Sequence, residues 1–304
     1  MEAAAGGAMK RKAEYWKALT EGRIQCRLCP QCCILRENDW GRCEARQNID
    51  GTMTIPFYGH ISALALDPIE KKPLRHFLPG TITFSVGFWH CTMACPFCQN
   101  WEIAHPSSDR NSTKRGSSLG GLVLEPEALI ERAITSGCPS ISVTYSEPCL
   151  HAEYLQDSMV LARKAGLKTI LVTNGCILEE PARNILVLCD AVNVDLKTDS
   201  AEIYEKSLSG NIQVVQNFIR AAHEICHVEV TSLLVPGILD RSDQIEAIAT
   251  YLASVSRAIP LHITSYHPAF HWCRPALSRQ ATEAIAKPAF GILDNVHLVL
   301  PYPY

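Results

Sequence analysis

The sequence predicts an α/β protein whose core is an incomplete barrel of parallel strands, preceded by a small cysteine-rich extension. After residue 80, short apolar segments alternate with helical ones of about ten to fifteen residues, a pattern typical of βαβ units and a parallel sheet. Before residue 80 the chain is rich in turns and cysteines and poor in periodic apolar residues. Since 304 residues suffice for one large domain with an appendage, we expect an extension at 1–80 and a core barrel at 81–304.

The extension contains three segments with a recognisable pattern. Residues 10–19 could form a short helix, and residues 51–59 alternate in a way that predicts a strand of a hairpin. Residues 67–80 contain prolines and end in Pro-Gly, which predicts an extended or turned connector whose charges face solvent.

The extension also carries a group of cysteines, of which Cys26, Cys29, Cys33 and Cys43 could surround one tetrahedral ion or support an iron–sulfur cluster. A bound metal would add folding energy to a segment that has little core of its own. They could equally be reduced thiols on a loop-rich lid, because no second C-x2-C hook completes a zinc pattern. The sequence leaves this metal site open.

The core is expected to contain six strands, each ending near polar residues, with helices between them. The expected strands are residues 81–87, 141–145, 169–172, 191–197, 227–234 and 261–266, and the expected helices are 125–136, 151–165, 181–188, 211–225 and 242–256.

Composition narrows the class of protein and its surroundings. A hydrophobic fraction of 47% and a charged fraction of 19% are ordinary for a folded protein. A formal charge of −3 gives no electrostatic reason to expect nucleic acid or an anionic membrane as a partner. No apolar run is long enough for a secretory signal or a membrane span, so we expect a cytoplasmic protein.

The chain holds fourteen cysteines, and in a reducing compartment these bind metal or remain free thiols. Several lie singly among apolar residues, and we interpret these as core packing: Cys138, Cys149, Cys176, Cys189 and Cys226.

Polar residues gather where parallel strands are expected to end. Cys91, Glu147, Asn174, Asp195 and Lys197 all fall at or just beyond such ends, which is where α/β barrels place their chemistry. Residues two apart on a strand also share a face. That rule extends the polar lining inward to these residues: Asn193, Glu229, Thr231, His262, Thr264 and Tyr266. Each alone could be an ordinary buried polar group, but together they favour a ligand pocket.

Cys91, Cys95 and Cys98 form a C-x3-C-x2-C loop directly after the first expected strand. A four-iron cluster normally takes four thiolates, so three leave one iron with an open position for a ligand. The alternatives are half of a zinc site or small buried side chains. The odd gap of three residues and the strand before the loop favour the cluster.

Six segments together resemble radical S-adenosylmethionine (SAM) proteins of the AmmeMemoRadiSam system, which are relatives of pyruvate formate-lyase-activating enzymes. They are residues 67–80, 91–101, 144–148, 173–175, 195–197 and 266–268. The resemblance implies a partial (β/α)6 TIM-type barrel of the radical SAM superfamily. It also implies a 4Fe-4S cluster on Cys91, Cys95 and Cys98, with SAM in the barrel mouth.

The resemblance also implies SAM contacts. Phe97 would lie on the adenine side. Glu147 stands where relatives have a Gly-Gly-Glu motif that binds the SAM amino group, although Tyr145 and Ser146 replace the glycines. Asn174, Asp195 and Lys197 are candidates for the SAM ribose and carboxylate. Residues 269–274 are only loosely similar to the family, and we expect a longer tail with a Gly-Asn turn after the last strand.

The implied activity is reductive cleavage of SAM to a 5'-deoxyadenosyl radical, which abstracts hydrogen from an unidentified substrate. An external donor would supply the electron. The substrate could be a partner protein that receives a glycyl radical, a small molecule or another protein of the same system. The alternative is a non-catalytic iron–sulfur or zinc scaffold.

Overall fold

The computed structural model describes residues 11–106 and 121–300 of the chain. Its centre is a nine-stranded sheet with the order β15-β14-β13-β12-β11-β10-β8-β7-β9. Neighbouring strands from β8 to β15 are parallel, as in a partial TIM-type barrel. These strands are β8 (Ile82–Phe88), β10 (Ser140–Thr144), β11 (Lys168–Thr173), β12 (Ala191–Asp195), β13 (His227–Leu234), β14 (Leu261–Ser265) and β15 (Val296–Val299).

The sheet therefore has one more parallel strand than the six expected. β15 pairs with β14 through the register Leu261↔Val296 to Thr264↔Val299, so the chain after residue 269 extends the barrel edge. At the other edge β7 (His60–Pro68) runs antiparallel to β8, and β9 (Leu122–Val123) pairs with β7. The division at residue 80 stays a prediction, although β7 precedes it and belongs to the barrel sheet.

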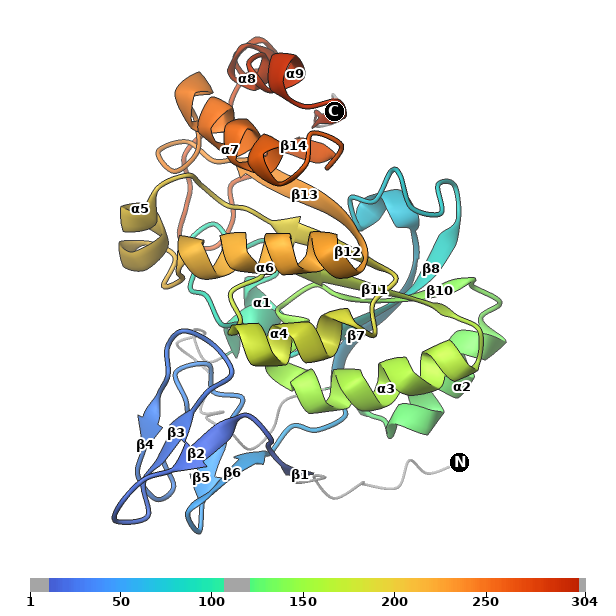
Figure 1. The fold of residues 1–304 in the computed structure, drawn as a ribbon, viewed down its shortest axis with the longest axis vertical. Coiled ribbons are helices and arrows are strands. Elements are labelled where there is room, and N and C mark those ends of the chain that lie inside the picture. The colour runs from blue at the N-terminus through green and yellow to red at the C-terminus, as the bar shows by residue number, and fades with distance from the viewer. Residues whose placement is uncertain (1–10, 107–120, 301–304) are drawn as a thin grey trace.

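Helices cover the outer face of the sheet, where α2, α3, α4 and α6 are stacked in front of the strands (Figure 1). The helices are α1 (Trp101–Ala104), α2 (Pro126–Thr135), α3 (Ala152–Lys164), α4 (Glu179–Leu186), α5 (Ala201–Lys206), α6 (Ile212–Ile225), α7 (Ser242–Val255), α8 (Arg279–Ala286) and α9 (Ala289–Ile292), with 3-10 turns at η1 (Ile69–Lys71) and η3 (Pro148–His151). The five long helices expected between strands are thus confirmed, with ends shifted by at most one residue, or by two at each end of α4.

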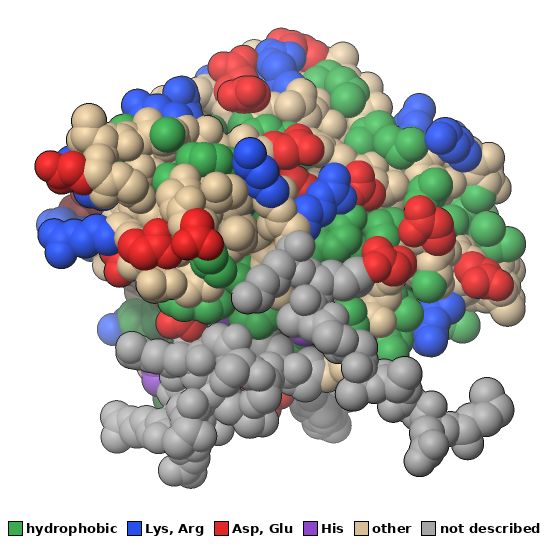
Figure 2. Space-filling view, turned by 90° about the horizontal axis from the view of Figure 1, so that it is seen from below, with side chains coloured by type: hydrophobic (Ala, Val, Ile, Leu, Met, Phe, Trp, Pro, Cys, Tyr) green, Lys and Arg blue, Asp and Glu red, His purple; other side chains and the backbone are tan. Residues whose placement is uncertain are grey.

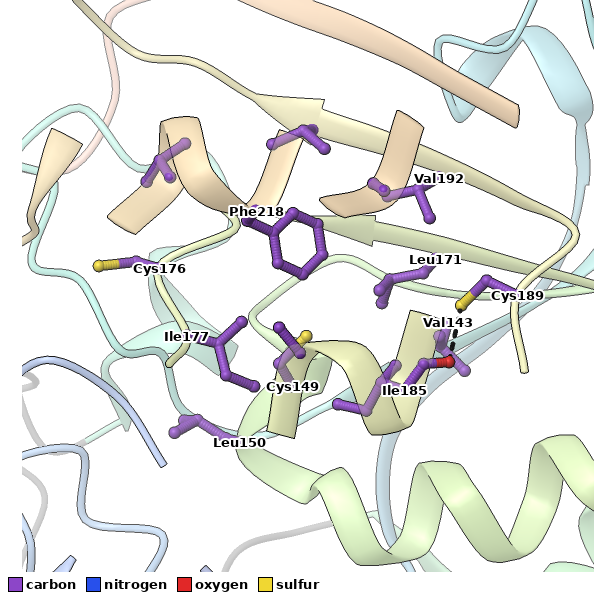
Figure 3. Packing of buried hydrophobic residues seen from close by; sticks show 14 of the residues in the cluster. Val143, Cys149, Leu150, Leu171, Cys176, Ile177, Ile185, Cys189, Val192 and Phe218 are labelled. Carbon is purple, nitrogen blue, oxygen red and sulfur yellow. Dashed lines mark hydrogen bonds between the residues drawn. The ribbon is translucent and has the colours of Figure 1, made fainter. Parts of the chain in front are cut away.

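The main core lies between these helices and the strands. Phe218 of α6 points toward the aliphatic side chains Leu171 and Val192 of the sheet (Figure 3). Cys189 joins the same packing and its thiol donates to the Ile185 carbonyl at 3.4 Å. Cys138, Cys149, Cys176 and Cys189 are buried in this core and Cys226 packs against it, which confirms that the scattered cysteines serve packing.

The extension forms two small antiparallel sheets, β1-β6-β5 and β2-β3-β4, beside the barrel (blue in Figure 1). Their strands are β1 (Arg11–Lys12), β2 (Trp16–Ala18), β3 (Ile24–Cys26), β4 (Ile34–Leu35), β5 (Gln47–Ile49) and β6 (Thr52–Ile55). The expected hairpin strand is β6.

The helix expected at residues 10–19 is wrong, and its first residue lies outside the described part. Burial alternates there, because Ala13 and Tyr15 are buried while Glu14 between them is exposed. A period of two suits a strand rather than a helix. β2 accordingly pairs with β3, with Trp16 opposite Cys26.

The connector at residues 67–80 also differs from expectation, because it closes the amino-terminal end of the barrel strands. Ile69 and Leu74 are fully buried against Ile170 and Ala191, near the first residues of β11 and β12. Its charges are not all solvated, since Lys72 is only 2% exposed and is paired with buried Asp67. The connector is a plug, held by contacts with strands far along the chain.

On the face shown in Figure 2, acidic and basic side chains of the described residues are interspersed, and neither sign forms a continuous field.

Candidate active site

The cysteine loop lies at the carboxyl end of the parallel strands. Cys91, Cys95 and Cys98 line one cavity of about 300 Å³. The backbone of the loop is clamped on both sides, because Ala94 N–H donates to the Leu208 carbonyl and the Pro96 carbonyl accepts from His271 N–H, each at 2.9 Å. The three thiols are therefore brought together at one point of the barrel mouth, as expected.

The ends of three successive strands form the cavity wall opposite the loop. Most of the expected site residues line the cavity: Phe97 comes from the loop itself, and Asn174, Asp195 and Lys197 come from the ends of strands. Asn174 Nδ2 approaches Cys91 Sγ at 3.6 Å and donates to Thr92 Oγ1 at 3.0 Å. Asn174 is thus an amide donor directed at one of the candidate ligand sulfurs.

Lys197 provides a positive charge beside the thiols. Its Nζ lies 3.0 Å from Asp195 Oδ2, and the side chain is largely buried. Burial lowers the pKa of Lys197, but Asp195 and Cys95 outweigh it, so the pKa is raised and the ammonium persists. Burial raises the pKa of Cys95 to about 12, against the opposing effect of Lys197. A bound metal removes such a proton outright, and the ammonium then faces a thiolate.

Glu147 does not line the cavity. Its Oε1 accepts from Thr173 Oγ1 at 2.7 Å and from Cys149 N–H at 3.0 Å, and its Oε2 accepts from Asn174 N–H at 2.9 Å. Burial raises the pKa of Glu147, which opposes these three donors. The carboxylate therefore fastens the ends of β10 and β11, and through them it positions Asn174.

A network that the sequence did not reveal lies in the same wall. Tyr145 lines the cavity and donates from its phenol to Asp67 Oδ2 at 2.5 Å. Lys72 Nζ is 2.7 Å from the same oxygen and lies 4.5 Å from the centre of the Tyr145 ring. Tyr145 has a φ of 75°, which is a strained backbone for a bulky residue. Asn100 Nδ2 donates a hydrogen bond to the Tyr145 carbonyl at 2.5 Å. A Cβ added to Gly87 would come within 2.7 Å of the Tyr145 ring, so the glycine makes room for that ring.

Tyr145 is therefore a fixed wall of the cavity. β7 brings Asp67 into this network. The sequence signal that could have predicted this strand is the alternating stretch at His60–Pro68.

The deeper polar residues of the strands do not line this cavity, so the expected polar-lined pocket is wrong for them. Glu229 accepts from His262 Nε2 at 2.6 Å, from His227 Nε2 at 2.9 Å and from two backbone N–H groups of the connector. Asn193 donates to the Pro73 carbonyl at 2.9 Å and accepts from Thr231. Tyr266 donates to the Trp272 carbonyl. Glu229 and Asn193 thus bond to the connector and hold the plug in place, whereas Tyr266 fixes the segment at Trp272.

Among residues 11–106 and 121–300, no three His, Cys, Asp or Glu side chains are arranged to hold a single metal ion. A cluster spreads its thiolates around a larger body than one ion does. The donor set at the loop, three thiols with an amide and an ammonium beside them, therefore fits an iron–sulfur cluster better than a zinc ion.

The sequence profile of the radical SAM superfamily matches residues 90–252 of this chain. The match spans more than half of the chain and includes the loop and the strand ends that form the cavity. The chain belongs to the radical SAM superfamily.

Within that superfamily, the chain is 35% identical over 260 residues to an uncharacterized protein of Methanocaldococcus jannaschii, covering 85% of this chain and 75% of that protein. It is also 23% identical over 198 residues to the pyruvate formate-lyase 1-activating enzyme of Escherichia coli, covering 62% and 75%.

Solved structures agree with the fold. SuiB of Streptococcus suis bound to S-adenosylmethionine matches with a TM-score of 0.55 and 13% identity, over 73% of this chain and 51% of that one. QueE from Escherichia coli matches with a TM-score of 0.50 and 16% identity, over 80% and 93%.

Radical chemistry that depends on SAM is thereby the class of activity of this chain, and its cofactors are a 4Fe-4S cluster and SAM. Such an enzyme needs an electron donor. None of the helices in the described ranges is long and apolar enough to cross a membrane.

Proposed function

We propose that this chain cleaves S-adenosylmethionine reductively and directs the resulting radical to abstract hydrogen from a substrate. The observation that carries the proposal is the convergence of Cys91, Cys95 and Cys98 with Asn174 and Lys197 on one cavity. Three cysteines around a cavity match a cluster that keeps one iron open for a ligand. When bound, the cluster and SAM together supply one-electron cleavage of the sulfonium to a 5'-deoxyadenosyl radical.

The residues of the chain bind, orient and shield. The three thiolates would hold the cluster, and Asn174 would donate to the sulfur of Cys91, which it already approaches. Lys197, oriented by Asp195, is suited to an anionic carboxylate of SAM. Phe97 is 3% exposed and offers an apolar surface to the adenine.

Tyr145 and the plug complete the enclosure. Lys71 and Lys72 of the plug reach the cavity, so the floor is closed by the segment that blocks the amino-terminal end of the strands. Closure on that side limits the access of water and oxygen to a radical, which is the protein's main contribution in cofactor enzymes of this kind. The similarity to a pyruvate formate-lyase-activating enzyme supports a protein as one class of substrate, beside small molecules.

The test is anaerobic reconstitution with iron and sulfide, followed by dithionite, SAM and measurement of 5'-deoxyadenosine. We expect the wild-type chain to release 5'-deoxyadenosine, and Cys91→Ala, Cys95→Ala and Cys98→Ala to lose it together with the cluster absorbance. Cys189→Ala is the matched control, because this thiol is buried in the core away from the cavity. A zinc-bound, colourless protein that releases no 5'-deoxyadenosine would instead indicate a scaffold.

A further inference from the structure

The four separated cysteines of the extension come together in space. Cys26 is the last residue of β3, Cys29 and Cys33 lie in the turn before β4, and Cys43 lies between β4 and β5. All four line a small, largely enclosed cavity. The backbone fixes two of them as neighbours, because Cys26 N–H donates to the Cys33 carbonyl at 2.9 Å. Cys32, in the same turn, does not line this cavity.

Arg46 lines the same cavity and is 1% exposed. Its two terminal nitrogens are satisfied by Glu153, at 3.0 and 2.6 Å, and by the Leu150 carbonyl at 3.1 Å. Its Nε is buried and has no hydrogen-bond partner among the described residues. A buried N–H without a partner requires an explanation, and a sulfur that carries negative charge is an acceptor it could serve.

The thiols are not reactive groups exposed to solvent. Cys26 and Cys29 are buried, and Cys33 and Cys43 are partly buried. Four thiols directed at one enclosed cavity beside a guanidinium therefore suit a metal centre better than a redox switch.

We propose that Cys26, Cys29, Cys33 and Cys43 ligate a second iron–sulfur cluster. We favour a cluster over one zinc ion because no three metal-binding side chains among the described residues are placed to hold a single ion, while the four thiols still surround one enclosed cavity. The radical SAM loop shows the same property in this structure, and its cofactor is a four-iron cluster. Four cysteine thiolates are the usual complete ligand set of such a cluster.

The second centre would lie next to the first. Thr92, which follows the ligand Cys91, lines the cavity between the four cysteines. Cys43 and Cys91 also line a common cavity of about 430 Å³ between the extension and the loop. The extension thus places a fully ligated cluster beside the open one, and the metal would add folding energy to the two small sheets.

The experiment uses the full chain with the radical SAM loop disabled by the triple substitution Cys91→Ala, Cys95→Ala and Cys98→Ala. After anaerobic reconstitution, we expect this variant to keep roughly four iron and four sulfide per chain, against roughly eight of each in the wild type. Its reduced form should give the electron paramagnetic resonance signal of an iron–sulfur cluster. This readout does not depend on SAM cleavage, so failure of the proposed function leaves it intact.

Two further variants complete the test. Adding Cys33→Ala and Cys43→Ala to the triple variant should abolish the remaining iron, whereas adding Cys32→Ala should not. If the triple variant binds no iron, or binds one zinc ion instead, the proposal is overturned. The proposal would also be overturned if the variant with Cys32→Ala and the variant with Cys33→Ala and Cys43→Ala contained the same amount of iron.

Discussion

The phenol of Tyr145 lies 2.5 Å from Asp67 Oδ2, so a wall residue of the cavity is tied to a carboxylate 78 positions earlier in the chain. Asp67 also holds the ammonium of Lys72, which is 2% exposed. One buried carboxylate therefore orients a wall of the cavity and neutralises the buried lysine beneath it.

Replacing Asp67 by Asn should destabilise the protein by about 3–5 kcal/mol, because breaking a buried pair leaves the charge of Lys72 without compensation. Urea unfolding of the metal-free protein measures this loss. Asp243→Asn is the control, since its pair with Arg241 is exposed on both sides and contributes little. Equal effects of the two substitutions would contradict the role of Asp67.

Glu229 should make stability depend on pH. Burial raises the pKa of Glu229, but hydrogen bonds from His227 and His262 outweigh it and hold the pKa well below the ordinary 4.5. A carboxyl with a lowered pKa in the folded state stabilises above its ordinary pKa, and the contribution is lost as the pH falls. Glu229→Gln should therefore cost about 1.5–3 kcal/mol at pH 7, and the difference should shrink below pH 4.5. Urea unfolding from pH 7 to pH 3 tests this, and a constant difference would count against it.

Lys197→Met should weaken SAM binding about 10- to 100-fold, because a hydrogen bond to a charged group contributes about 1.5–3 kcal/mol. Isothermal titration of the reconstituted protein with SAM measures the dissociation constant. Lys197→Arg retains the positive charge and should recover part of the affinity. Unchanged affinity in Lys197→Met, with full iron content, would remove Lys197 from the SAM site.

Asn174→Leu should lower the midpoint potential of the cluster on the loop. Hydrogen bonds to ligand sulfurs favour the reduced, more negative cluster, and Asn174 approaches the sulfur of Cys91. Potentiometric titration followed by electron paramagnetic resonance measures the change. Asn217→Leu, on the exposed face of α6, is the matched control. A potential equal to that of the control would show that the amide does not reach the sulfur.

The barrel strands were predictable because their signal is local. β11 and β12 are short apolar runs that end in polar residues, and the cysteine loop follows β8 directly. The loop, Asn174, Asp195 and Lys197 could be placed at the barrel mouth by the rule that parallel strands end on one side.

The errors arose where partners are distant in sequence. Glu229 and His262 were expected to line a pocket, but Glu229 is satisfied by backbone donors about 150 positions earlier, at Arg75 and His76. The solvated charges expected in the connector were wrong for the same reason, since Asp67 and Lys72 pair inside the barrel. A period of two at Ala13 and Tyr15 was the overlooked signal against a helix.

The connector that blocks one end of the barrel also limits the routes by which molecules can enter and leave the cavity. With Ile69 and Leu74 packed under the strands, the cavity is closed at the amino-terminal end of the barrel. In the proposed reaction, SAM, the substrate and both cleavage products would all enter and leave at the carboxyl end. A bulky substrate docked across it would trap SAM inside, so turnover should require the substrate to depart before methionine and 5'-deoxyadenosine can be exchanged.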